Sequence, residues 1–77
     1  MQSNTIAKFV KSGHWTKVSE LEIMSDSGCF VEERRYIVFS KGPNRELREH
    51  LYQGVDAKRR AMEQFEFTKS VIELNVG

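Results

Sequence analysis

The chain of 77 residues contains one cysteine, one proline and two histidines, and it has no long apolar run. A single thiol excludes an intramolecular disulfide and a thiolate metal site, and it favours a reducing compartment. His14 and His50 are too far apart in sequence for a zinc site, which needs three or four convergent ligands. No stretch approaches the roughly 18 apolar residues of a membrane span, and the N-terminus lacks a signal-peptide pattern. The sequence therefore predicts a soluble cytoplasmic protein without metal or cofactor.

An excess of one charge is also lacking, because 11 Asp and Glu residues balance 12 Lys and Arg residues, for a net charge of +1. A domain that coats phosphates usually has a pI above about 9. The balance excludes a chain that is basic throughout and leaves a local basic patch open. At this length we expect one complete small domain with a modest core, for which oligomerisation is a common remedy.

The longest segment with a strand preference is 29–40, which turn-forming residues bracket on both sides. β-branched and aromatic side chains fill its second half. Four charges at 32–35 interrupt both of its faces, which favours either a bulge or a solvated segment with cross-strand ion pairs. In a regular strand Glu32 and Glu33 point to opposite faces, so they could not bind one cation together.

Two earlier strands are predicted at 5–10 and 15–24, joined by a turn at Gly13. In the second of these strands the apolar and polar residues have opposite parity, which is typical of a strand with one wet face: Trp15, Leu21 and Ile23 against Thr16, Glu20 and Glu22. Short connections make the successive strands antiparallel neighbours.

Segment 45–52 fits two patterns. Its residues are good helix formers, with Asn44 as an N-cap and Gly54 just beyond the end. The preceding Gly-Pro-Asn run at 42–44 is an equally good hairpin turn, and a meander up to this point favours a fourth antiparallel strand. We expect the strand.

A helix is predicted to begin after Asp56 as N-cap and to continue through Phe67. Its apolar stripe is narrow and consists of Ala57, Ala61, Met62 and Phe65. Residues 70–76 alternate again, which indicates a terminal strand. The predicted fold is α+β, a single domain over 1–77: an antiparallel meander of about four strands, with a fifth at the C-terminus as an option, whose apolar face packs on one main helix.

Catalysis has little support in the sequence. Cys29 follows a turn glycine, and His14 lies one hairpin away, conceivably close in space. A reactive thiol needs a lowered pKa and an adjacent base, whereas a small, partly buried cysteine at the start of a strand is the simpler interpretation. A single sheet under one helix also encloses little volume for paired carboxylates. We therefore expect neither an enzyme nor a small-molecule substrate.

The aromatic residues exceed what one helix on one sheet easily covers, unless they all form the core. Aromatic side chains concentrate binding energy at interfaces, so the candidate protein-binding residues are Trp15, Tyr36, Phe39 and Tyr52. The leading hypothesis is a non-catalytic interaction module that docks on a protein partner or associates with itself as a homodimer. Compact chains without motifs are frequent among phage and mobile-element accessory proteins, including inhibitors of host enzymes.

The alternative hypothesis is a nucleic-acid-binding module with a basic patch. The patch would consist of Arg34, Arg35, Arg45, Arg48, Lys58, Arg59 and Arg60. Stacking on an aromatic residue such as Trp15 would add to phosphate contacts. Acidic residues are interleaved with the same bases, however, and this pattern also fits a solvated surface with local ion pairs.

Overall fold

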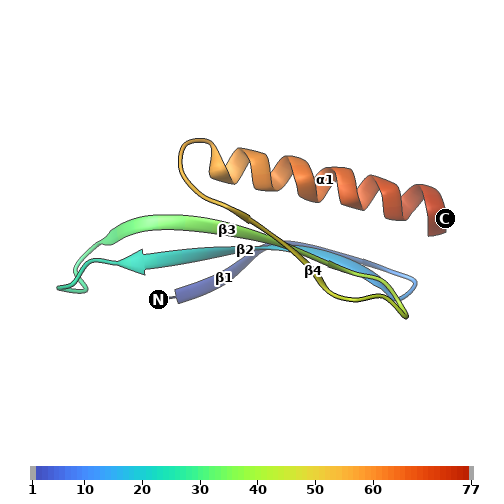
Figure 1. The fold of residues 1–77 in the computed structure, drawn as a ribbon, viewed down its shortest axis with the longest axis horizontal. Helices are drawn as coiled ribbons and strands as arrows, with labels where there is room; N and C mark the ends of the chain where they lie inside the picture. The colour runs from blue at the N-terminus through green and yellow to red at the C-terminus, as the bar shows by residue number, and fades with distance from the viewer. Residues whose placement is uncertain (1, 77) are drawn as a thin grey trace.

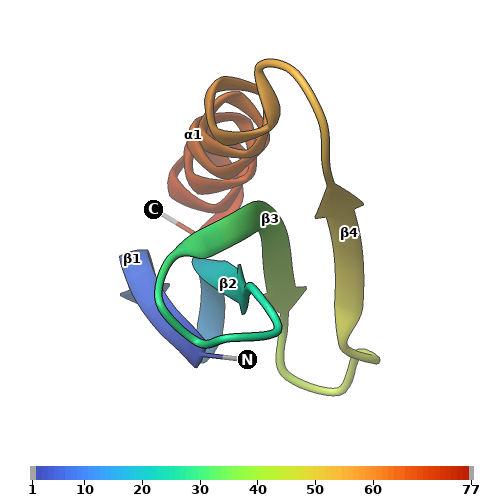
Figure 2. The same ribbon diagram turned by 90° about the vertical axis from the view of Figure 1, so that its left-hand side faces the viewer.

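A computed structural model describes residues 2–76, which form one four-stranded sheet and one helix. The elements are β1 (Gln2–Lys11), β2 (His14–Met24), β3 (Val31–Lys41), β4 (Arg48–Tyr52) and α1 (Ala57–Val76). The strands are antiparallel in the order β1-β2-β3-β4, and α1 lies along one face of the sheet (Figures 1 and 2). This confirms the predicted α+β meander with one main helix.

The ambiguous segment contains a strand, as expected, although β4 covers only Arg48–Tyr52. Asn44 has a φ of 61°, and the Arg45 backbone N–H donates to the Gly42 carbonyl at 3.3 Å. This bond closes a turn that reverses the chain. Pairing of the following residues with β3 then outweighs their helix propensity.

The predicted terminal strand at 70–76 is wrong, because α1 continues to Val76. Ile72 lies seven residues after Phe65 and is 8% exposed, so it extends the buried side of the helix by two turns. Leu74 is 85% exposed, although it would share a face with Ile72 in a strand. Within residues 2–76 no helix is long and apolar enough to cross a membrane.

The helix starts at Ala57 as predicted, but Asp56 is not a conventional N-cap. Its φ is 61°, whereas an N-cap residue usually has β-region dihedrals. Its carbonyl accepts the Arg60 N–H at 2.9 Å, and its carboxylate accepts a hydrogen bond from the Arg59 guanidinium at 3.4 Å. The Asp56 side chain therefore stabilises the first turn of α1 through its hydrogen bond with the Arg59 side chain.

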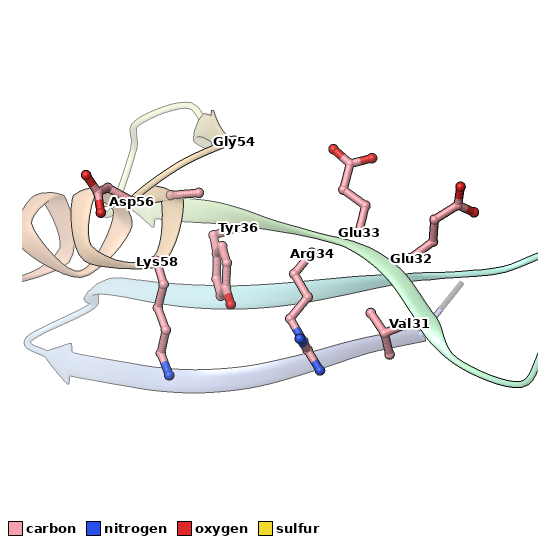
Figure 3. Close-up of a pocket in the computed structure, with 9 residues that line it drawn as sticks. Val31, Glu32, Glu33, Arg34, Tyr36, Gly54, Asp56 and Lys58 are labelled. Atoms are coloured by element: carbon pink, nitrogen blue, oxygen red, sulfur yellow. The ribbon is translucent and has the colours of Figure 1, made fainter.

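The charged segment at 32–35 contains a bulge, one of the two alternatives that its pattern left open. Pairing with β2 passes from Ile23–Glu33 to Met24–Val31, so Glu32 is an extra residue in β3. The bulge lets Glu32 and Glu33 point to the same side, against the expectation of opposite faces (Figure 3). A second extra residue, Ile6, interrupts the pairing of β1 with β2.

The core lies between α1 and one face of β2 and β3. It consists of Val18, Tyr36 and Val38 from the sheet and Ala57, Ala61 and Phe65 from the helix. The two alanines are at most 4% exposed, and their small side chains let the helix lie close to the sheet. The covered face therefore has the parity of Thr16 and Val18. The sequence predicted that the helix covers the apolar face, which on β2 is the face of Trp15. This prediction is wrong, because α1 covers the opposite face.

Candidate functional site

The sheet has a second apolar face, which no helix or strand of residues 2–76 covers (Figures 1 and 2). We call it the open face and define it by the residues whose parity is opposite to that of the core: Ser3, Thr5, Lys8 and Val10 of β1; Trp15, Lys17, Ser19, Leu21 and Ile23 of β2; Glu33, Arg35, Ile37, Phe39 and Lys41 of β3; Glu49 and Leu51 of β4. At its two edges Val10 is 58% and Leu51 55% exposed.

One end of the open face combines aromatic rings with lysines. The Lys17 ammonium lies 5.2 Å from the ring centroid of Phe39 and 5.9 Å from that of Trp15. Both distances are within the range of a cation–π contact. Lys8 is the register partner of Lys17 on β1, so two like charges stand directly opposite each other. Such a pair destabilises a sheet. We call Lys8, Trp15, Lys17 and Phe39 the aromatic–lysine cluster.

The other part of the open face is aliphatic. Leu21 and Ile23 lie on β2, while Ile37 on β3 has Ser19 and Leu51 as its register partners on either side. At its margin the Arg35 guanidinium donates two hydrogen bonds to the Glu33 carboxylate, at 3.1 and 3.2 Å. These two charges neutralise each other locally. The aliphatic part can therefore contact an apolar surface without leaving either charge buried and unpaired.

The four predicted protein-binding aromatics divide between the two faces. Trp15 and Phe39 lie together on the open face, around Lys17. Tyr36 belongs to the core and is 6% exposed, and its hydroxyl donates to Glu20 at 2.7 Å. Burial is the larger cause of the raised pKa of Tyr36, and this hydrogen bond is the second. Tyr52 is the register partner of Tyr36 on the helix side, with the Arg60 guanidinium 5.4 Å from its ring centroid.

The seven predicted nucleic-acid-binding residues do not form one patch. Arg34 and Lys58 line a hollow at the start of α1, while Arg45 and Arg48 line another near its end. Arg35 is on the open face. The Arg59 guanidinium contacts Glu63 at 2.8 Å and Asp56 at 3.4 Å. These hydrogen bonds, first to Glu63 and then to Asp56, raise the pKa of Arg59.

The first hollow has a volume of about 420 Å³ and lies between the bulged end of β3 and the first turn of α1. Figure 3 shows Arg34 and Lys58 directed to one side and Glu32 and Glu33 to the other. The second hollow, of about 280 Å³, lies between the C-terminal half of α1, the start of β2 at His14 and Trp15, and the residues that join β3 to β4. The diverging charges of the first hollow do not form a convergent polar site.

Cys29 and His14 lie at opposite ends of the sheet, so the expectation that they might be close is wrong. The eleven residues of β2 separate the two turns. At about 3.3 Å per residue the separation is on the order of 35 Å. Cys29 is exposed in the turn before β3, rather than partly buried at a strand start. In the described part of the chain no three His, Cys, Asp or Glu side chains gather as metal ligands.

Lys8, Lys17, Val10 and Leu51 belong to the open face but were not singled out from the sequence. A signal for two of them was present, because Lys17 has the parity of Trp15, and the tight turn at Gly13 sets which β1 residue faces it. Comparisons with protein-family models, curated proteins and solved structures find no match to the chain. What it binds must therefore be inferred from its own surface.

Proposed function

We propose that the chain is a non-catalytic interaction module that docks on a protein partner through the open face. The observation that carries the proposal is the set of large apolar side chains on the two central strands of an uncovered sheet: Trp15, Leu21, Ile23, Ile37 and Phe39. Contiguous apolar surface rimmed by polar residues marks interaction sites in soluble proteins. Tryptophan and other aromatic residues are also prominent among the side chains that dominate binding energy.

The size of the open face suits a single interface. Strands β1, β2 and β3 contribute about nine residues each at about 3.3 Å per residue, β4 contributes five, and each strand is about 4.8 Å wide. The projected area is on the order of 500 Å², and side-chain relief raises the accessible area above this value. A standard interface buries about 800 Å² on each partner.

The partner of such a face presents apolar side chains to its aliphatic part. The narrower form of the proposal is an accessory protein of a phage or mobile element that blocks a host enzyme. Blocking requires a complementary surface and no catalytic group, which agrees with the open face and with the diverging charges of the first hollow.

The test compares two lysine substitutions of exposed leucines. Leu51→Lys changes the open face, and the matched control Leu74→Lys changes the outer side of α1, where the leucine is 85% exposed. The tagged full-length chain and both variants are used to recover cross-linked partners from the cells that express it, and circular dichroism confirms that each variant is folded. We expect Leu51→Lys to reduce recovery of a specific partner at least about tenfold, because a charge is then buried unpaired.

The control variant should recover the same partner as the unchanged chain. Equal recovery with Leu51→Lys, or cross-links confined to α1, would rule out docking through the open face.

A further inference from the structure

The aromatic–lysine cluster carries unneutralised positive charge beside partly exposed rings. Lys8 and Lys17 face each other across β1 and β2, and within residues 2–76 neither makes an ion pair. On the same row of the sheet the acid Glu49 is separated from Lys17 by Phe39. The repulsion between the two lysines is relieved when an anion binds next to them.

A second copy of the chain does not supply that anion. The open face carries four bases, Lys8, Lys17, Arg35 and Lys41, against three acids, Glu33, Glu49 and the bulge residue Glu32, which points to the same side as Glu33. Two copies placed face to face would bring surfaces of the same net sign together. The occupant of this end must therefore bring negative charge.

The rings add a second requirement. Trp15 and Phe39 are diagonal neighbours on adjacent strands, because Trp15 pairs with Lys41, two residues beyond Phe39. Diagonal neighbours lie about 7–8 Å apart. They can accept two successive flat groups, provided that these groups are free to unstack. Unpaired bases meet this requirement and stack on aromatic side chains of open sheets, whereas the bases of a duplex are already stacked on each other.

We propose that the aromatic–lysine cluster binds single-stranded nucleic acid, with Trp15 and Phe39 stacking on bases and Lys8 and Lys17 contacting phosphates. This site goes beyond the proposed protein docking, because its ligand is a nucleic acid and its two lysines play no part in that proposal, although both sites use Trp15 and Phe39. It also differs from the seven-residue basic patch, since none of the residues of the cluster belongs to that set.

Trp15 is the only tryptophan, so its fluorescence reports on the site directly. The full-length chain is titrated at low salt with a short oligothymidylate, an oligouridylate, a duplex of equal charge and polyglutamate of equal charge. We expect saturable quenching by both single strands, with weak effects of duplex and polyglutamate. The tighter of the two strands then distinguishes DNA from RNA. For two phosphate contacts the logarithm of the affinity should fall with that of the salt concentration at a slope of about −1.4.

Three variants separate stacking from charge. Phe39→Leu keeps an apolar side chain but removes the ring, so binding should weaken about tenfold. Lys8→Ala and Lys17→Ala should each reduce the magnitude of the salt slope by about 0.7. Lys58→Ala removes the same charge from the start of α1 and should change neither quantity. Circular dichroism establishes that each variant is folded.

Three results would overturn the site: no quenching at low salt, equal quenching by polyglutamate or duplex, or an effect of Lys58→Ala as large as that of Lys17→Ala. Loss of oligonucleotide binding together with intact partner recovery would leave the protein-docking proposal standing.

Discussion

At the scale of single residues, Tyr36 contributes both to the core and to a hydrogen bond at the margin of the covered face. Its ring is buried, and its hydroxyl donates to the Glu20 carboxylate at 2.7 Å. Ionised Tyr36 would be poorly solvated and would face the negative charge of Glu20 across the same distance. The fold therefore stabilises the neutral phenol, and burial together with the hydrogen bond raises the pKa of Tyr36.

A raised pKa in the folded state implies a defined pH dependence. The stabilisation is fully present below the unfolded pKa of about 10 and is lost as the pH rises through the folded value. We expect Tyr36→Phe to lower the free energy of unfolding by about 1 kcal/mol near pH 7, because it removes the hydrogen bond. Urea unfolding should also show a smaller decline in stability above about pH 10 for Tyr36→Phe than for the unchanged chain.

Tyr52→Phe is the matched control, since Tyr52 is the register partner of Tyr36 and is only partly buried. It should retain the full decline at high pH. An undiminished decline in Tyr36→Phe would show that this tyrosine does not couple ionisation to folding.

At the scale of elements, the last segment shows where a short apolar pattern is ambiguous. The alternation of Ile72 and Leu74 favoured a strand, but Ile72 also continues the helical stripe from Phe65. Periodicity alone does not separate the two over so few residues. Packing favours the helix over the strand, because a continuous α1 buries Ile72 against the sheet without a further turn in the chain.

The two side chains give a direct test of that assignment. Ile72→Ala should lower the free energy of unfolding by about 2–4 kcal/mol, since it truncates a buried side chain. Leu74→Ala should change it by less than about 0.5 kcal/mol, because Leu74 is exposed. Urea unfolding of both variants is the measurement. Similar losses for the two would favour a strand, in which they share one face.

The sheet shows a second limit of sequence reasoning. Parity correctly grouped Trp15, Leu21 and Ile23 on one face of β2. It could not tell which face α1 would cover, because Val18, Tyr36 and Val38 make the other face apolar as well. That choice depends on the direction in which the chain leaves β4 and on the fit of Ala57 and Ala61, and neither is encoded in the period of a strand.

At the scale of the whole molecule, the chain is an elongated body of 48 × 22 × 16 Å. The β2–β3 hairpin extends beyond the start of α1 (Figure 1), so the helix covers only part of one face. Trp15 and Phe39 could be named from the sequence because aromatics are conspicuous. Lys8 and Lys17 were indicated only indirectly, through the parity of Trp15 and the turn at Gly13, and the register of β1 on β2 shows that they lie opposite each other.

The central claim is that the open face is free in the isolated chain and is covered when a partner binds. Acrylamide quenching of Trp15 fluorescence, measured over a wide range of chain concentration, tests it most directly. We expect Trp15 to be accessible to acrylamide at every concentration, because the net positive charge of the face opposes self-association, and to become shielded when a partner is added. Shielding in the isolated chain that increases with its concentration would contradict the account, because a second copy would then already occupy the face.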